Sequence, residues 1–178
     1  MSKEKLRDGR YTRPVRLPYG WASAVLDGGR LISVAWEEDR ERLLSTVAGT
    51  YPGATAAGPE ETGPEAFLRE YAEGKTVSIR DIAALPIAWE KAHGFDRAVL
   101  RETARVPYGS TVTYGELAAR AGSPGAARAA GAALARNPWP VIIPCHRVVG
   151  VGGNLVGFGK GLAAKDALIR FEERRLSP

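Results

Sequence analysis

The 178-residue sequence has one cysteine, two histidines and no long hydrophobic run. A single cysteine excludes an intramolecular disulfide and is typical of a reducing compartment. One cysteine and two histidines cannot supply the usual zinc ligands, so we expect no metal. No apolar run has the length of a membrane span, and residues 1–5 lead into polar sequence rather than into a secretory signal. We therefore expect a cytoplasmic protein that makes no membrane contact.

Acidic residues are scarce in the C-terminal part of the chain. Residues 1–100 carry 14 Lys and Arg against 15 Asp and Glu, a net charge of −1, whereas residues 101–178 carry 11 against 5, a net charge of +6. This asymmetry predicts a C-terminal surface that faces a polyanion such as a nucleic acid. A solvated basic face would have the same composition, so the charge alone leaves both interpretations open.

The first 90 residues predict a small α/β domain. Residues 22–26 and 31–36 are mainly apolar and flank Asp27-Gly28-Gly29, a pattern typical of a β-hairpin. Two helices are expected over residues 39–47 and 64–72. The remaining segments predict a loop over residues 50–62 and a short strand over 76–79.

Residues 91–178 predict a second, mainly helical domain. Helices are expected over residues 95–105, 114–121 and 124–136, the last with Ser123 as its N-cap and Pro124 in its first position. The second and third of these helices, joined through a glycine-containing turn, are typical of a helix-turn-helix, although an ordinary helical hairpin has the same pattern. The expected fold class is α/β (α+β), with a small N-terminal α/β domain and a helical C-terminal domain.

The third helix has an unusual composition, because Arg128 is the only polar side chain in residues 125–135. A helix that reads base edges needs several long polar side chains, which this segment lacks. It can approach a surface closely and project one cation, which favours minor-groove contact by shape. An alanine-rich core helix with a solvent-facing Arg128 is the alternative.

The only cysteine lies in Pro144-Cys145-His146-Arg147, after the segment Asn137-Pro138-Trp139-Pro140. Prolines fix the backbone angle φ and cannot continue a helix, so Cys145 is expected on a stiff, extended element. A stiff mount suits a nucleophile that must attack in line. The alternative for a lone cysteine is a small buried hydrophobic residue.

With these features together, the chain resembles the O6-alkylguanine-DNA alkyltransferases, also called methylated-DNA–protein-cysteine methyltransferases. The resemblance runs from about Phe95 to Glu172 and is most specific in the segment from Asn137 to Val149, with a weaker echo in Leu68-x-x-Tyr71-x-x-Gly74. It implies that an alkyl group moves irreversibly from O6-alkylguanine, and from O4-alkylthymine, to Cys145. It also implies that the damaged nucleotide is flipped out of duplex DNA, that each monomeric molecule acts once, and that no cofactor is needed.

The resemblance also implies roles for other residues in the reaction. His146 would act on the thiol through a water, and Glu172 would orient His146. Glu172 follows Leu168 and Ile169 by four and three residues, so on a helix it lies beside an apolar stripe, where a carboxylate needs a partner. Tyr114 would donate a hydrogen bond toward guanine N3, and Asn137 would brace the turn around the cysteine.

The remaining implied residues contact DNA or the flipped base. Arg128 would fill the gap that the flipped nucleotide leaves, on a helix whose DNA-facing positions are Ala126, Ala127, Ala129 and Gly131. The substrate pocket would contain Pro140, Val148, Phe158, Gly159 and Lys160, and the backbone around Val148 would read the edge of the guanine. The family commonly has tyrosine at the position of Phe158 and often serine at that of Gly159, and Lys160 borders the mouth of the pocket. These differences concern the range of alkyl groups and not the reaction class.

Three other functions are compatible with parts of the sequence. A non-catalytic lesion sensor of the same fold would lack the acceptor cysteine, which this chain has. A helix-turn-helix regulator would need base-reading side chains in residues 125–135, where alanines stand. A thiol hydrolase would turn over, whereas the alkyltransferase interpretation allows one event per molecule.

Overall fold

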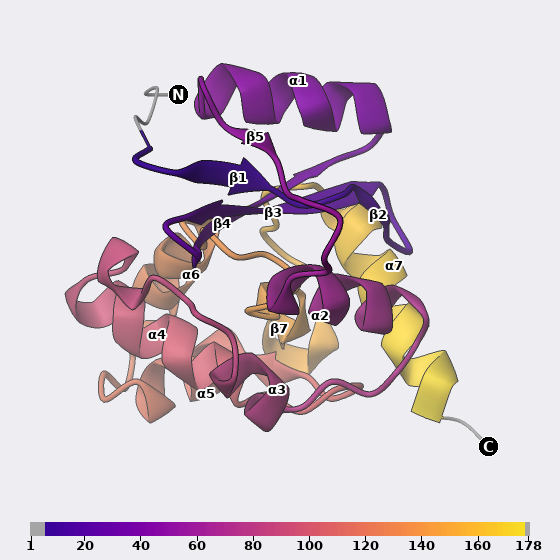
Figure 1. Ribbon diagram of the computed structural model, residues 1–178. Helices are drawn as coiled ribbons and strands as arrows, with labels where there is room; N and C mark the ends of the chain where they lie inside the picture. Colours follow the sequence, from indigo (N-terminus) through magenta and orange to yellow (C-terminus); the bar gives the residue numbers. More distant parts are fainter. Residues whose placement is uncertain (1–5, 177–178) are drawn as a thin grey trace.

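The hairpin predicted around Asp27 forms the centre of a sheet in the N-terminal half of the chain. The structure, a computed structural model, describes residues 6–176 (Figure 1), so residues 1–5, on which the expectation about a secretory signal rests, lie outside it. Strands β3 (Trp21–Asp27) and β4 (Arg30–Glu37) pair antiparallel. Their turn needs Gly28 and Gly29, whose φ angles are +54° and +78°.

Three further strands complete the mixed sheet in the described part of the chain. Strands β1 (Gly9–Tyr11) and β2 (Val15–Arg16) both pair antiparallel with β3, and β5 (Thr55–Ala56) pairs parallel with β1. The strand β5 lies inside the segment that was predicted to be a loop. A strand of two residues gives no sequence period, so its pairing with β1 is what defines it.

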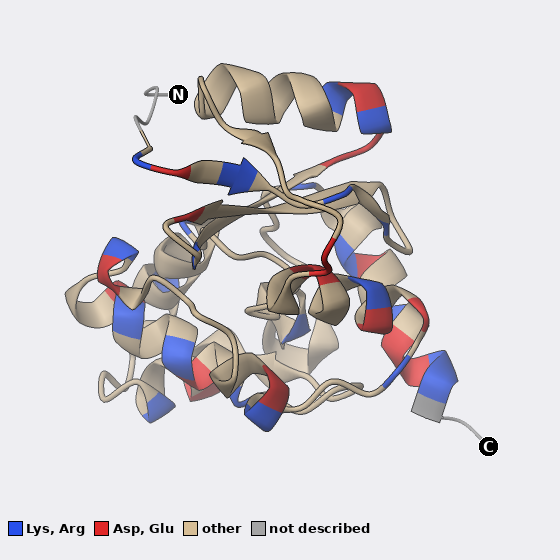
Figure 2. Cartoon of the chain, viewed as in Figure 1, with Lys and Arg blue, Asp and Glu red and all other residues tan. Residues whose placement is uncertain are grey.

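The sheet separates two hydrophobic cores. Helix α1 (Arg40–Thr50), which Asp39 caps, covers one face and forms a small core with alternate residues of the sheet. Helix α2 (Gly63–Ala72) and the C-terminal elements lie on the opposite face, where the large core is (Figure 1). Both helices begin within one residue of the predicted position. In the two hairpin strands charged residues lie only at the ends, and the middle carries none (Figure 2).

The strand predicted over residues 76–79 is wrong. Helix α3 (Ile79–Ala83) begins there, because Ser78 and Asp81 form a capping box. The Ser78 hydroxyl accepts from the backbone N–H of Asp81, and the Asp81 carboxylate accepts from the backbone N–H of Ser78. These two bonds start a helix in a segment whose β-branched residues favoured a strand.

The C-terminal part of the chain is mainly helical, as predicted, and contains a two-stranded parallel sheet. In chain order its elements are η1 (Trp89–Lys91), α4 (Gly94–Ala104), β6 (Val112–Thr113), α5 (Tyr114–Arg120), α6 (Ala127–Ala135), η2 (Cys145–Arg147), β7 (Val148–Val149), η3 (Val151–Gly153) and α7 (Leu162–Leu176). The expected α/β class, with a mixed sheet followed by a helical part, is confirmed.

Helix α6 begins three residues later than predicted, and Ser123 is not its N-cap. The segment from Ser123 to Ala126 is a turn in which the Ala126 N–H donates to the Ser123 carbonyl at 3.1 Å. Pro124 and Gly125 take its two central positions, and Gly125 has a φ angle of +83°. Proline followed by a glycine with positive φ is typical of a type II turn. Because Gly125 is not in a helical conformation, no helix can run on from Pro124.

Candidate active site

Cys145 lies on a short segment constrained by backbone hydrogen bonds, but the segment is a helical turn and not the extended element that its prolines predicted, because the Arg147 N–H donates to the Pro144 carbonyl at 2.9 Å. It begins the 3-10 helix η2, and its N–H donates to the Ile143 carbonyl at 2.8 Å. Asn137 holds the preceding turn from both sides, because its Oδ1 accepts from the Trp139 N–H and its Nδ2 donates to the Ile143 carbonyl, both at 3.0 Å. Within this turn Val141 has a φ angle of +72°, which is strained for a β-branched residue and is typical of a functional site.

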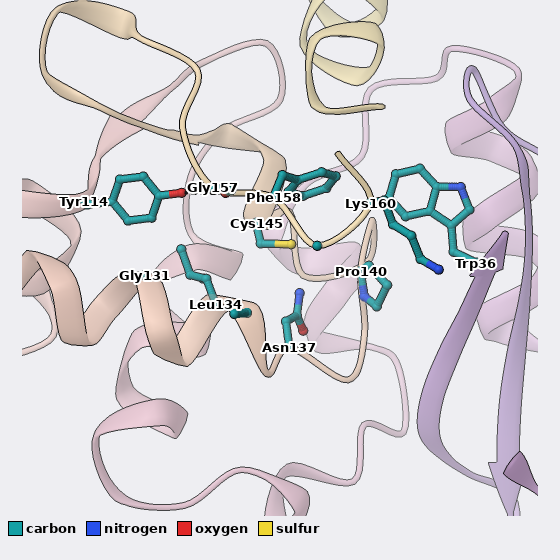
Figure 3. A pocket seen from close by; sticks show the side chains of 12 residues that line it. Trp36, Tyr114, Gly131, Leu134, Asn137, Pro140, Cys145, Gly157, Phe158 and Lys160 are labelled. Atoms are coloured by element: carbon teal, nitrogen blue, oxygen red, sulfur yellow. Dashed lines mark hydrogen bonds between the residues drawn. The ribbon is translucent and has the colours of Figure 1, made fainter. Parts of the chain in front are cut away.

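A pocket opens in front of the thiol (Figure 3). Of the predicted pocket residues, Pro140, Phe158, Gly159 and Lys160 line it, together with Cys145. Val148 is not among the lining residues and its side chain is buried in β7, so a contact of its backbone with the guanine stays a prediction. The other lining residues are Trp36, Tyr114, Gly131, Leu134, Ala135, Asn137 and Gly157.

Cys145 is only 8% exposed. Burial raises its pKa, because a thiolate loses hydration there, while the Asn137 side chain and the positive charge of Lys165 act in the opposite direction. The thiol therefore needs a base before it can act as a nucleophile at neutral pH.

The carboxylate of Glu172, on α7, is the centre of a buried network. Its Oε1 accepts from the Tyr71 hydroxyl at 3.0 Å and lies 2.7 Å from Nε2 of His146. Its Oε2 accepts from the Gly109 N–H and from Nε of Arg147, both at 2.9 Å. The second guanidinium contact, from Nη2 of Arg147 to Oε1, is 3.1 Å long. The prediction that this carboxylate needs a partner is confirmed, and it has four.

These contacts determine the protonation of His146. The Glu172 carboxylate accepts at Nε2, so that nitrogen carries the proton and Nδ1 is left as an acceptor. Nδ1 is buried and has no hydrogen-bond partner among the described residues. Burial lowers the pKa of His146, partly against the effect of Glu172, so the imidazole is neutral. Burial opposes ionisation of Glu172, yet His146 and Arg147 lower the pKa of its carboxyl group to about 2.

Tyr114 is held in the pocket by its position and by its hydroxyl group. It is the first residue of α5, whose N-terminus Thr113 and Glu116 cap reciprocally. Its hydroxyl lies 3.0 Å from the carbonyl oxygens of Val156 and Gly157, to either of which it can donate. Burial raises the pKa of Tyr114, and the neighbouring thiol adds to this effect.

Lys165 is a buried cation that the sequence patterns did not single out. Its Nζ donates to the Tyr114 hydroxyl at 3.3 Å and to the Val156 carbonyl at 2.9 Å. It lies 5.4 Å from the centroid of the Tyr114 ring and 5.9 Å from that of Phe158. Burial lowers its pKa to about 8. The signal was the helical spacing, because Lys165 precedes Leu168 by three residues and Glu172 by seven, and therefore shares their face of α7.

Three further residues of this region lacked a predicted role. Arg147 stood in the cysteine motif, and Tyr71 stood in the weaker echo near residue 70, so both had a sequence signal. Trp36 had none, because it lies in the N-terminal hairpin, far from the motif in the chain.

A surface groove adjoins the pocket and contains the predicted DNA-contacting arginine. It is lined by Tyr114, Ala127, Arg128, Gly131, Val156 and Gly157, and three of these residues also line the pocket. Arg128 and Ala129 are exposed, whereas Ala130 and Leu134 on the other side of α6 are in the core. Ala126 is half-buried and packs against that core. Helix α6 thus has both a core face and an open face of small side chains with one cation.

Residues 6–176 contain no group of three or more His, Cys, Asp or Glu that could hold a metal ion. No helix in the same range is long and apolar enough to cross a membrane.

The chain is similar to known proteins over most of its length. Residues 94–174 match the family described as 6-O-methylguanine DNA methyltransferase, DNA binding domain. A methylated-DNA–protein-cysteine methyltransferase of Shigella flexneri is 38% identical over 146 residues, which are 80% of this chain and 83% of that protein. One of Mycolicibacterium paratuberculosis is 50% identical over 84 residues, which are 47% of this chain and 50% of that protein.

A solved structure supports the same relationship. The Mycobacterium tuberculosis OGT in complex with DNA has a TM-score of 0.74 and 30% sequence identity, with 93% of this chain and 94% of that chain covered. The similarity therefore includes the N-terminal sheet, which the family model does not reach.

Proposed function

This chain belongs to the methylated-DNA–protein-cysteine methyltransferase family, and on that premise we propose that Cys145 is its alkyl acceptor. The chain binds DNA and acts in direct-reversal repair of alkylated DNA. One observation carries the assignment of Cys145: the sole thiol forms the wall of a pocket, and the next residue, His146, is paired with a buried carboxylate.

The first step is the activation of the thiol. Nδ1 of His146, which lacks a protein partner among the described residues, takes the thiol proton through a bridging water, and Glu172 holds the imidazole in the tautomer that can accept it. The thiolate then attacks the alkyl carbon of O6-alkylguanine. An S–C bond forms, the C–O6 bond breaks, and its electron pair stays on the guanine. The thioether that forms at Cys145 is not cleaved by water, so each molecule acts once.

The second requirement is a neutral leaving group. Tyr114 donates its hydroxyl proton to guanine N3 as negative charge develops on the base. The Lys165 ammonium, which donates to the Tyr114 oxygen, stabilises the phenolate and can return a proton to it. The guanine then leaves as a neutral base.

The substrate is O6-alkylguanine in duplex DNA, and O4-alkylthymine presents a comparable alkyl ether. Helix α6 enters the minor groove, because its open face has small side chains that allow close approach. The protein binds DNA as a monomer. Arg128 occupies the gap that the flipped nucleotide leaves, where a planar guanidinium recovers part of the unstacking energy.

Two further proposals concern the chain as a whole. We divide it into an N-terminal α/β domain, residues 1–90, and a DNA-binding and alkyl-acceptor domain, residues 91–178. A thiol that acts once has to stay reduced until it meets damage, which supports a cytoplasmic location.

Substitution of the acceptor tests this proposal. We expect Cys145→Ala and Cys145→Ser to transfer no methyl group from O6-methylguanine DNA, while DNA binding stays within about threefold of the unchanged protein. A serine hydroxyl ionises far less readily than a thiol, so the serine variant removes the nucleophile with little change of shape. Appreciable methyl transfer by Cys145→Ala would exclude Cys145 as the acceptor.

A further inference from the structure

The pocket has two ends, and they come from different parts of the chain (Figure 3). Tyr114 lies at one end and Trp36 and Lys160 lie at the other, with Cys145 between them. In the proposed function Tyr114 donates to the base, so the base occupies its end of the pocket. A long alkyl group, which must pass the thiol, then extends toward Trp36 and Lys160.

The N-terminal sheet supplies a wall at this alkyl end. Trp36, near the end of β4, is 2% exposed, and its indole N–H donates to the Tyr19 carbonyl at 2.7 Å. Its ring lies edge-on to Phe158, with 5.9 Å between the ring centroids and 66° between the planes. Trp36, a residue of the N-terminal sheet, therefore packs against the ring of the pocket residue Phe158.

The next residue, Glu37, binds the other pocket residue at this end. Its Oε1 lies 3.2 Å from Nζ of Lys160 and accepts from the Thr46 hydroxyl at 3.2 Å. Its Oε2 lies 3.5 Å from Nε of Arg42. Thr46 and Arg42 are on α1, so Glu37 is positioned by elements of the N-terminal half and its side chain is only 15% exposed.

The segment that carries Phe158 and Lys160 depends on such contacts. Gly157, Gly159 and Gly161 occur at every second position, and the first and last have φ angles of +48° and +85°. Glycine restricts the backbone little, so side-chain contacts have to hold this segment in place. Tyr114 binds its first residue, Gly157, and Lys165 binds Val156 just before it, whereas Trp36 and Glu37 contact its later part.

We propose that Trp36 and Glu37 are specificity-determining residues, which hold residues 157–161 against the N-terminal sheet and so limit the size of the O6-alkyl group. Glu37 is a positioning residue, because it acts through Lys160. This inference rests on the proposed function and gives the N-terminal sheet a part in choosing the substrate.

The Glu37–Lys160 ion pair limits the size of the alkyl group only while it is closed. The Lys160 side chain is 37% exposed, and ion pairs of this exposure contribute little and weaken with salt. The pair therefore opens at modest cost, and a bulky group enters when it is open. A methyl group fits whether the pair is open or closed.

Selectivity between a bulky and a small alkyl group tests the proposal. The second-order rate constants are measured for free O6-benzylguanine and for O6-methylguanine in duplex DNA, with the unchanged protein, Glu37→Gln, Lys160→Gln and the double variant. We expect the ratio of the benzyl to the methyl rate constant to rise about threefold in Glu37→Gln, the factor that fits a partly exposed ion pair. Lys160→Gln should raise it similarly, and the double variant no further.

Two controls separate the ion pair from a general structural effect. Glu38→Gln changes the neighbouring glutamate, which binds Tyr19 and not Lys160, and it should leave the ratio at that of the unchanged protein. Because O6-benzylguanine is uncharged, salt affects its reaction only through the protein. Its rate constant should rise with salt in the unchanged protein and stay level in Glu37→Gln.

The possible failures are distinct. If Glu37→Gln alkylates at Cys145 with an unchanged ratio, or if the effects of the two single variants add in the double variant, the selectivity role of Glu37 is wrong and the proposed function stands. If the unchanged protein is not alkylated at Cys145 by either substrate, the proposed function fails and this inference fails with it.

Discussion

Nε2 of His146 lies 2.7 Å from Oε1 of Glu172, and both side chains are buried. The same carboxylate binds the Arg147 guanidinium, so with a neutral imidazole the three side chains carry no net charge. Glu172 therefore acts on His146 mainly by fixing its tautomer and orientation, and only secondarily by its negative charge. Replacement of this carboxylate by an amide tests whether Glu172 controls the tautomer of His146 or only stabilises the fold.

We predict that Glu172→Gln lowers the rate of methyl transfer by about hundredfold or more, which is the range for loss of a general base. The amide can donate to Nε2, and the proton then moves to Nδ1, which no longer accepts from the thiol. The apparent pKa of the thiol in the pH–rate profile should rise. Glu173→Gln, an exposed neighbour on α7, is the control. A profile unchanged by Glu172→Gln would return Glu172 to a structural role.

Arg147 should matter more for stability than the surface arginines. Removal of one partner of a buried ion pair costs about 3–5 kcal/mol, because the other charge stays buried and unpaired. We therefore expect Arg147→Met to lower the free energy of unfolding by about that amount in urea titrations. The control is Arg136→Met, whose arginine pairs with Asp96 and is 60% exposed, and whose cost should be about 1 kcal/mol or less. Equal losses would contradict the assigned network.

Arg128→Ala should slow the repair of duplex DNA much more than the reaction with free O6-benzylguanine. Only the duplex requires a nucleotide to be flipped, and Arg128 lies in the exposed groove rather than in the thiol pocket. The two rate constants are compared for the same preparation at one salt concentration, because phosphate contacts make DNA binding depend on salt. If both rate constants fall by the same factor, Arg128 has a packing role instead.

Because of Lys165, we predict that the rate of methyl transfer decreases on the alkaline side of its pH profile. The pKa of Lys165 is lowered to about 8, so its ammonium donates to Tyr114 below that pH and is lost as the pH rises through it. In the unchanged protein the rate should therefore stop rising with thiolate formation and fall above about pH 8. Lys165→Met should be slower by about tenfold at pH 7, the effect of losing a charged donor, and should lack the alkaline decrease. A decrease that persists in Lys165→Met would point to another group.

Local patterns were sufficient for much of the fold. The hairpin was predictable because Gly28 and Gly29 separate two apolar runs, and α1 because its apolar residues recur at helical spacing. The predictions failed where one local motif outweighed another. The capping box at Ser78 started α3 where a strand was expected, and the turn at Gly125 made α6 begin later than expected. The two-residue strand β5 exists only through its pairing with β1, which no local pattern contains.

In the site, too, some features were predictable from local sequence and others depended on the tertiary fold. The segment around Cys145 indicated a nucleophile, the family resemblance added His146 as its base, and the spacing of Glu172 indicated a carboxylate with a partner, while the catalytic roles stay predictions. Lys165 shares a helix face with Glu172, but its lowered pKa depends on burial between Tyr114 and Phe158, which follows from the packing of α7. Trp36 and Glu37 reach the pocket from more than 100 positions away in the chain, so only the tertiary fold could reveal them.

The central claim is a single, irreversible transfer to Cys145, and the intact mass of the protein after reaction tests it most directly. The protein is incubated with an excess of duplex DNA that contains O6-methylguanine, and the product is digested to locate the change. The account predicts that every active molecule gains one methylene equivalent, on the peptide with Cys145, and then stops reacting. Repaired DNA without a gain in protein mass, or more repaired bases than protein molecules, would contradict it.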